Sequence, residues 1–281
     1  ATGGLVYLAG TFIKLFGVTK AWMIIMLIIA VIMVSVGVYH YFMLPNPKGE
    51  ANKEPVSLKD SLHELLEVFL DFFTKRHIVY YICFIILYRF AEGFVMKIVP
   101  LFLKASRAEQ GLGLSEQEIG LYYGTFGAAA FVVGSILAGY YIAWRGLQKS
   151  LFSLALVFNI PFVAYTFLAL YQPESLWLIG GGIVMEYFGY GFGFVGLSLF
   201  MMQQVAPGKH QMAHYAFASG IMNLGVMLPG MMSGYISDKL GYQHFFLVVL
   251  VCTIPALLIT WFVPFTYPDA TKKVKVSAEN E

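Results

Sequence analysis

Long apolar runs separated by short polar segments make up most of the chain. Seven of these runs are long enough for a bilayer-spanning helix, which needs about 20 mostly apolar residues. They cover residues 22–43, 78–101, 118–142, 150–171, 177–203, 212–237 and 243–265. Residues 5–13 are also apolar but too few to span, and we expect residues 1–13 to be the last part of a helix that starts upstream. The pattern predicts an all-α, polytopic membrane protein.

The composition supports this class. Of the 281 residues, 59% are hydrophobic and 12% are charged, whereas soluble domains carry about 25% charged residues. So little charge cannot cover a water-exposed surface, which excludes an ordinary soluble enzyme, a disordered chain and a secreted disulfide scaffold. The net charge of +2 indicates no nucleic-acid partner. Cys83 and Cys252 lie in separate apolar runs without metal-ligand spacing, so neither a metal nor a cofactor is expected.

The long polar segment at residues 44–76 is expected to be a linker. It begins with irregular backbone at Pro45, Pro47 and Pro55. Ser57 and Asp60 then have the spacing of a capping box, which predicts a helix over residues 57–75. Apolar and acidic residues fall on different faces of this helix: Leu58, Leu62, Leu65, Phe69 and Phe72 against Asp60, Glu64, Glu67 and Asp71. The helix either lies along the membrane surface or packs on the bundle as a solvated connector.

Lysine and arginine residues fall unequally on the two sides of the predicted spans. Eleven lie in the linker, in the turn at 142–150, at Lys209 and in the tail, and five lie in the turns on the other side. Because cytoplasmic loops carry the excess of these residues, the linker and the C-terminus are predicted to be cytoplasmic. The expected parts are the end of an N-terminal transmembrane half (1–43), the linker (44–76), a C-terminal six-helix half (77–266) and a cytoplasmic tail (267–281).

A short glycine pattern repeats at turns between predicted helices. Residues 10–22 and 234–246 both read Gly-x6-Gly followed by two large side chains, and residues 139–146 have the same glycine spacing. The first two copies lie in outside turns of the two predicted halves. This placement fits parallel repeats related by an axis along the membrane normal.

Two six-helix halves joined by a long cytoplasmic linker resemble the major facilitator superfamily. The Gly-x6-Gly turn is similar to that family's loop motif, whose fuller form carries an aspartate four residues after the first glycine. Asp238 occupies this place in the outside turn, whereas Ala143 occupies it in the cytoplasmic turn, which weakens assignment to the drug-efflux or sugar-porter members. The resemblance implies that the chain covers the end of the fifth helix through the twelfth. Its partners would then include the missing N-terminal helices of the same transporter.

Within this superfamily the sequence most resembles the AmpG-type muropeptide permeases. The segments that carry the resemblance are LYRFAEGFVMKIVPLFL (87–103), LSEQEIGLYYGTFG (114–127), MEYFGYGFG (185–193) and HYAFASG (214–220). The resemblance implies a permease of the bacterial inner membrane that takes up a peptidoglycan-derived muropeptide, or a similar anionic amino-sugar compound, by proton symport. The acetyl-CoA transporter branch shares the same outline, so acetyl-CoA, another anionic solute or a sugar are alternative substrates.

Four ionisable residues lie within predicted spans, where burial costs about 2.5–3.5 kcal/mol and function is the default explanation. Arg89 and Glu92 are three residues apart and share a helix face. We interpret them as a cavity site, with Arg89 for an anionic substrate group and Glu92 as a proton carrier; a purely structural ion pair is the alternative. Lys97 precedes Pro100 and is expected to snorkel to the outside interface.

Glu186 is the fourth of these residues, and no cation near it in sequence can neutralise it. An ionised carboxylate is costly inside an apolar run, which suits reversible protonation. The structural alternative is a protonated glutamate that is hydrogen-bonded to a neighbouring helix. The expected substrate-binding or proton-coupling set is completed by Tyr88, Tyr123, Tyr187 and Asn223, with Tyr122 and Tyr190 as further candidates.

Motifs for other functions are absent from the sequence or out of context. Gly191-x-Gly193-x-x-Gly196 matches a dinucleotide fingerprint but lies inside an apolar run, so close helix packing is the interpretation. His210 and His214 have metal-ligand spacing without a third ligand, and we interpret them as interface residues. The sequence contains no Walker loop, His-Glu-x-x-His motif or intramembrane serine–histidine pair. No catalytic residue is therefore predicted, and an intramembrane enzyme is a remote alternative.

Overall fold

The computed structural model describes residues 2–43 and 58–268, which are helical almost throughout. Five helical stretches are long and apolar enough to cross a membrane: Val18–Met43, Glu116–Arg145, Leu147–Tyr171, Leu176–Val205 and Gln211–Trp261. No strand occurs in the part of the chain that the structure describes. The predicted all-α, polytopic membrane class is confirmed.

Most predicted spans are built from consecutive helical pieces. The chain starts with α1 (Thr2–Phe16), α2 (Val18–Met43) and the linker helix α3 (Leu58–Thr74). Then follow α4 (Ile78–Tyr88), α5 (Phe90–Lys104), the short 3-10 helix η1 (Arg107–Glu109), α6 (Glu116–Ile119), the π-helix η2 (Gly120–Phe126) and α7 (Gly127–Arg145). The last are α8 (Leu147–Asn159), α9 (Phe162–Tyr171), α10 (Leu176–Phe200), the π-helix η3 (Met201–Val205) and α11 (Gln211–Trp261). Gly241 interrupts α11, and its two parts match the last two apolar runs of the sequence.

A glycine with positive φ lies at each Gly-x6-Gly turn. Gly17 (φ 79°) separates α1 from α2, Gly146 (φ 85°) separates α7 from α8, and Gly241 (φ 71°) divides α11. Residues with a Cβ rarely adopt such a backbone, whereas glycine does so readily. The repeat in the sequence is therefore a repeat of helix-ending turns, each with its second glycine at the turn.

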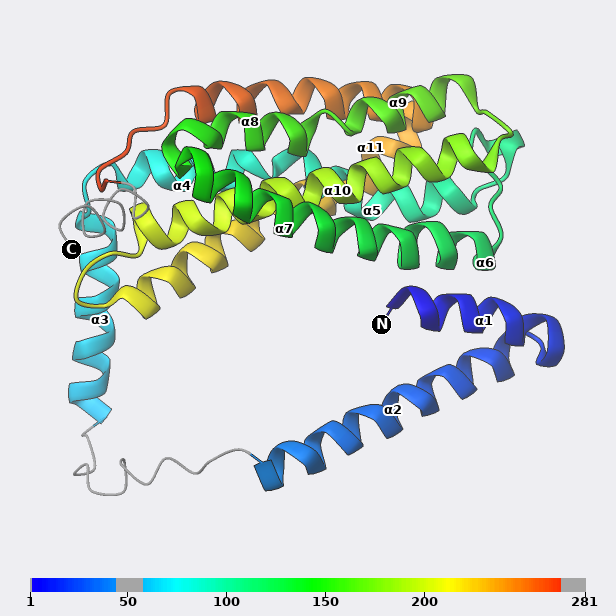
Figure 1. Ribbon diagram of the computed structural model, residues 1–281, viewed down its shortest axis with the longest axis horizontal. Helices are drawn as coiled ribbons and strands as arrows, with labels where there is room; N and C mark the ends of the chain where they lie inside the picture. The colour runs from blue at the N-terminus through cyan, green and yellow to red at the C-terminus, as the bar shows by residue number, and fades with distance from the viewer. Residues whose placement is uncertain (1, 44–57, 269–281) are drawn as a thin grey trace.

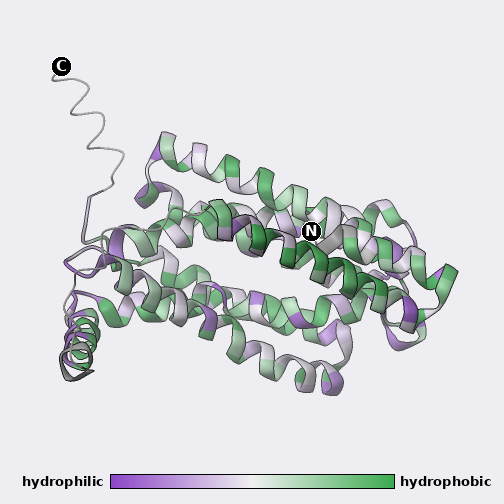
Figure 2. Cartoon of the chain, turned by 90° about the horizontal axis from the view of Figure 1, so that it is seen from below, coloured by the Kyte–Doolittle hydropathy of each residue, from purple (hydrophilic) through white to green (hydrophobic). Residues whose placement is uncertain are grey.

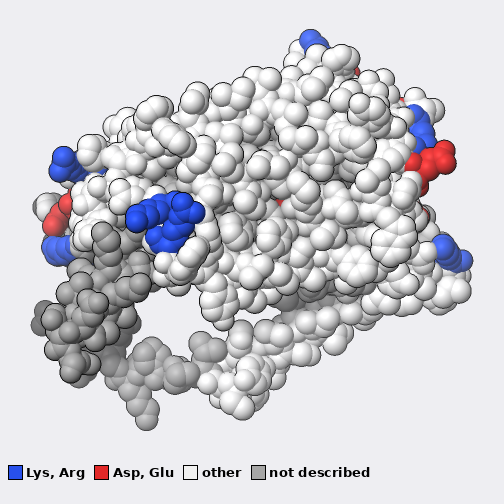
Figure 3. All heavy atoms as spheres, turned by 45° about the horizontal axis from the view of Figure 1, so that its top comes forward, with Lys and Arg blue, Asp and Glu red and all other residues white. Residues whose placement is uncertain are grey.

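The helices from α4 onward lie side by side in one bundle (Figure 1). Within it α10 packs on α7 and α8, and α11 packs on α4, α5 and α9. α1 contacts α6 and η2, whereas α2 diverges from the bundle with most of its apolar residues exposed. Hydrophobic residues cover much of the helices (Figure 2), and on the face shown in Figure 3 most charged side chains gather toward the two ends of the bundle. This distribution fits a band of lipid around the middle.

Glycines let α10 approach both neighbours closely. A Cβ at Gly191 would lie 2.1 Å from the carbonyl oxygen of Phe131 in α7. A Cβ at Gly193 would lie 2.4 Å from the Cβ of Phe158 in α8. Neither contact leaves room for a side chain, so this glycine run is a helix-packing surface, as predicted.

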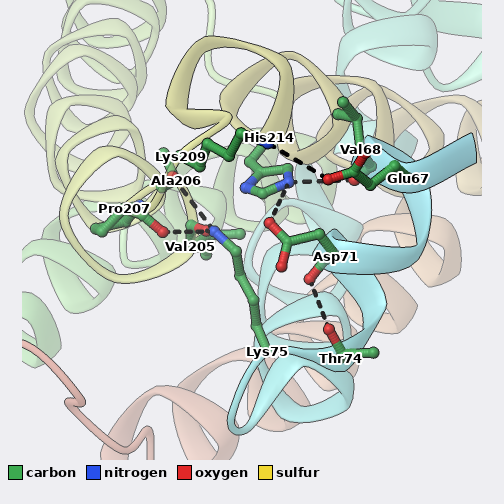
Figure 4. Close-up of polar contacts among 10 residues, drawn as sticks. All are labelled: Glu67, Val68, Asp71, Thr74, Lys75, Val205, Ala206, Pro207, Lys209 and His214. Carbon is green, nitrogen blue, oxygen red and sulfur yellow. Dashed lines mark hydrogen bonds and ion pairs between the residues drawn. The ribbon is translucent and has the colours of Figure 1, made fainter. Parts of the chain in front are cut away.

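The end of α3 docks on the bundle beside the start of α11 (Figure 4). Phe72 is fully buried, and its ring centroid lies 5.7 Å from that of His214 and 5.6 Å from that of Phe217. His214 Nε2 lies 3.2 Å from the carbonyl oxygen of Val68, and because a carbonyl only accepts, Nε2 is the donor. A carboxylate oxygen of Asp71 lies 3.6 Å from the same nitrogen. His214 thus joins two helices, and the described residues contain no group of three side chains that could hold a metal.

Lys75 binds the end of the helix formed by α10 and η3. Its Nζ donates to the carbonyl oxygens of Val205 at 2.7 Å, Ala206 at 3.3 Å and Pro207 at 2.7 Å (Figure 4). These carbonyls follow the last turn of the helix, where partners within the helix are missing. Burial lowers the pKa of the Lys75 amine, and the Asp71 carboxylate opposes this shift.

The two ends of α3 differ in what they contact. Near the end of α3, Phe72 and Val68 are buried against the bundle and the half-exposed ring of Phe69 lies 5.9 Å from that of Phe217, whereas Leu62 and Leu65, earlier on the predicted apolar face, are exposed. The connector interpretation therefore holds for the last turns of α3. The predicted capping residue Ser57 and the prolines before it lie outside the described residues.

Candidate functional site

Arg89 and Glu92 form a buried ion pair at a break in the helix. Arg89 has φ −104° and ψ 5°, and it separates α4 from α5, while Glu92 lies in the first turn of α5. Arg89 Nε donates to Glu92 Oε2 and Nη2 donates to Oε1, both at 2.6 Å. The two residues are 5% and 2% exposed. This is the planar, bidentate geometry in which an arginine binds a carboxylate most strongly.

The same guanidinium also contacts α10. Nη2 of Arg89 donates to the hydroxyl of Tyr190 at 3.4 Å. The guanidinium carbon lies 5.7 Å from the ring centroid of Tyr190 and 5.3 Å from that of Phe194, which is within cation–π range. The ion pair therefore links the break between α4 and α5 to the middle of α10.

Glu186 lies in α10, one helical turn before Tyr190. It is 8% exposed, and the hydroxyl of Tyr165 in α9 donates to its Oε2 at 3.3 Å. No lysine or arginine among the described residues forms an ion pair with Glu186. A lone buried carboxylate is costly, so the charge of this group depends on which water or partner reaches it.

One small cavity of about 40 Å³ brings the two carboxyl groups to the same space. Its walls come from α5, η2, α9 and α10. The lining residues are Glu92, Val95, Met96, Val99, Tyr123, Tyr165, Glu186, Tyr187 and Tyr190. A cavity of this volume has room for one or two water molecules. In this conformation the cavity is too small to enclose a solute as large as a sugar–peptide.

Four of the predicted site residues line this cavity: Glu92, Glu186, Tyr123 and Tyr187. Arg89 does not line the cavity, but it donates hydrogen bonds to Glu92, which does. The rings of Tyr123 and Tyr187 meet edge to face at 5.0 Å. Tyr123 comes from the π-helix η2, a type of helix that is frequent at functional sites.

The remaining predicted residues lie elsewhere. The hydroxyl of Tyr88 donates to the Gly193 carbonyl oxygen at 2.9 Å in the fully buried core. Asn223 is exposed on α11, and neither it nor Tyr88 is among the residues that line the cavity. Lys97 is exposed, and its position at the outside interface stays a prediction.

Tyr165 is the site residue that the sequence did not indicate. It is one of 18 tyrosines, it lies in a different helix from Glu186, and no motif marks its position. Only the packing of α9 beside α10 brings its hydroxyl to the carboxyl group. Tyr190 was a further candidate from the sequence, and the structure places it in the cavity wall.

Proteins named as AmpG transporters resemble this chain over much of its length. AmpG 2 of Rickettsia prowazekii, named as a transporter, is 24% identical over 222 residues, which are 75% of this chain and 51% of that protein. AmpG 2 of Rickettsia felis is 26% identical over 207 residues, which are 72% of this chain and 48% of its own length. No family model matches the chain.

The fold has a counterpart among solved structures. A crystal structure of a peptide transporter POT mutant in complex with alafosfalin matches with a TM-score of 0.54 and 18% identity, over 73% of this chain and 44% of that one. The chain spans about half the length of the curated relatives that it matches. These proteins are named as transporters and not as enzymes. The resemblance predicted from the sequence is confirmed: the chain is similar to proteins named as AmpG transporters and shares its fold with part of a peptide transporter.

Proposed function

We propose that this chain is part of a secondary active transporter that takes up a peptidoglycan-derived muropeptide, or a similar anionic amino-sugar compound, together with protons. The single observation that carries the proposal is the shared cavity. Glu92, which is paired with Arg89, and Glu186, a carboxyl group without a cation, border the same water-sized space. Such intramembrane ionisable groups mark substrate and proton paths in transporters.

Glu186 is the proton-coupling residue in this proposal. Enclosed among aromatic rings, its carboxyl group is more stable with a proton bound; exposed to water, it is stable without one. Alternating access supplies both surroundings in turn. The group then takes a proton on the acidic side and releases it inside, and the proton gradient drives accumulation of the substrate.

Arg89 and the tyrosines are the substrate-binding residues. Opening the cavity would give Arg89 an anionic group of the substrate as a second partner, in competition with Glu92. Tyr123, Tyr187 and Tyr190 offer aromatic faces and hydroxyl groups, which suit the ring and hydroxyls of a sugar. The AmpG names of the relatives support a muropeptide over acetyl-CoA or a simple sugar.

The proposed setting is the bacterial inner membrane. The chain would supply the C-terminal six-helix half at residues 77–266, and N-terminal helices of the same transporter would complete the cavity, as the half-length match to the relatives suggests. The excess of lysine and arginine supports a cytoplasmic position for the linker and the C-terminus.

Glu186→Gln tests the proposal in the complete transporter, reconstituted in proteoliposomes with a labelled muropeptide. Glutamine keeps the shape of the side chain but mimics permanent protonation. We expect proton-driven accumulation to be lost while exchange of labelled for unlabelled substrate continues. Glu64→Gln, at an exposed site on α3, is the matched control and should behave as wild type. Accumulation with wild-type pH dependence in Glu186→Gln would rule out Glu186 as the coupling residue.

A further inference from the structure

Tyr165 is the hydrogen-bond donor that the structure gives to Glu186. Its hydroxyl lies 3.3 Å from Glu186 Oε2, and the side chain has no exposed surface. Other groups that face the cavity are Glu92 from α5, Tyr123 from η2, and Tyr187 and Tyr190 from α10. Among the described residues, none of these donates a hydrogen bond to Glu186.

The ring of Tyr165 packs against α11. It stacks on Phe246 with the ring centroids 5.8 Å apart and the planes at 19°. The neighbouring Thr166 hydroxyl lies 3.2 Å from the Phe246 carbonyl oxygen and 3.1 Å from that of Phe162. Phe246 belongs to the second part of α11, so α9 and α11 together fix the direction of the Tyr165 hydroxyl.

We infer that Tyr165 is a positioning residue that sets how tightly Glu186 holds its proton. This inference rests on the proposed coupling role of Glu186. A hydroxyl that donates to a carboxylate stabilises the ionised form, and in surroundings of low polarity this effect is larger than in water. Because Tyr165 is anchored to α9 and α11 while Glu186 lies on α10, a shift of α10 against those helices lengthens or shortens the hydrogen bond. Helix motion thereby changes the proton affinity of Glu186.

Tyr165→Phe is the direct test, because it keeps the stacked ring and removes only the hydroxyl. In the complete transporter, the midpoint of the pH dependence of uptake should move upward by about one pH unit, which is about a tenfold change in proton affinity. Substrate exchange is measured beside uptake, so that a loss of binding is told apart from a shift in pH dependence. The matched control is Tyr80→Phe, which removes a hydroxyl that donates to the Ile259 carbonyl oxygen at 3.0 Å, away from the cavity. Its pH profile should match wild type.

Infrared titration of the purified transporter gives a second readout that does not need transport. The carboxylic-acid band that disappears in Glu186→Gln reports Glu186, and Tyr165→Phe should shift its titration midpoint upward by the same amount. An unchanged midpoint in both measurements overturns the inference. Failure of the proposed function gives a different result from failure of this inference. If the proposed function is wrong, Glu186→Gln keeps proton-driven accumulation, regardless of the result for Tyr165→Phe. The double variant Tyr165→Phe, Glu186→Gln should have the same pH dependence of substrate exchange as Glu186→Gln alone. A further shift of that pH dependence in the double variant would also contradict the inference.

Discussion

Arg89 binds both carboxylate oxygens of Glu92, each at 2.6 Å, at the residue where the helix is broken between α4 and α5. The guanidinium carbon of Arg89 also lies 5.7 Å from the ring centroid of Tyr190 and 5.3 Å from that of Phe194. A substrate that draws Arg89 away from Glu92 would leave a second unpaired carboxylate in the cavity. In the proposed function, one arginine would therefore link substrate binding to proton binding.

Arg89→Ala should abolish uptake by the complete transporter. The change removes the anion-binding group and leaves Glu92 buried without its partner, and breaking a buried pair in this way costs about 3–5 kcal/mol. Uptake of a labelled muropeptide and abundance in the membrane should be measured together. Abundance is expected to fall less than uptake.

The double variant Arg89→Met, Glu92→Leu separates a binding role from a structural one. It replaces the ion pair by apolar side chains, which often restores stability. If the pair serves substrate binding, abundance recovers while uptake stays absent. Recovery of uptake with abundance would show that the pair is only a structural lock.

Much of this arrangement could be predicted from local sequence. The Arg89–Glu92 pair follows from a spacing of three residues on a helix, and the helix-ending glycines follow from the Gly-x6-Gly repeat. The break at Arg89 has no glycine or proline to signal it, and the π-helix at Tyr123 has no known sequence pattern here. The Tyr165–Glu186 contact depends on how two helices pack, which local periodicity does not determine. Being close in sequence to a site residue is also not enough to place a residue in the site. Tyr88 neighbours Arg89 in sequence, yet its hydroxyl donates to the Gly193 carbonyl oxygen in the core.

Gly191→Ala should destabilise the bundle, because its Cβ would lie 2.1 Å from the Phe131 carbonyl oxygen and would force α7 and α10 apart. Overpacking of this kind costs about 1–3 kcal/mol. Thermal unfolding of the purified protein in detergent, followed by size-exclusion chromatography, should show a lower midpoint than wild type. Gly139→Ala is the control, since a Cβ there meets nothing within 4 Å. A midpoint that falls equally in both variants would refute the packing role of Gly191.

The membrane orientation predicts opposite accessibility for two exposed sites. Glu64 lies on α3 and Asp238 lies near the Gly241 turn; in the proposed orientation Glu64 is cytoplasmic and Asp238 is outside. Single cysteines at these positions, with Cys83 and Cys252 replaced by alanine, are treated with a membrane-impermeant maleimide in intact cells. Asp238→Cys should react at once, and Glu64→Cys only after permeabilisation. Reaction of both in intact cells would contradict the orientation.

Lys75→Met should loosen the helix end formed by η3. The Lys75 ammonium donates to three carbonyl oxygens there, and hydrogen bonds from charged groups stabilise by about 1.5–3 kcal/mol. Part of this gain offsets the burial of the amine, so we expect amide hydrogen exchange in residues 201–207 to accelerate by about tenfold, as measured by mass spectrometry. Lys209→Met is the matched control, because its side chain is 76% exposed and its ammonium lies 3.4 Å from Glu67 Oε1; exposed pairs of this kind contribute little. η3 continues α10, which carries Glu186. If the linker helix also restrains α10, amides of α10 on the cavity side of η3 should exchange faster as well. Protection of residues 201–207 that stays at the wild-type level in Lys75→Met would show that the docked linker does not stabilise this helix end.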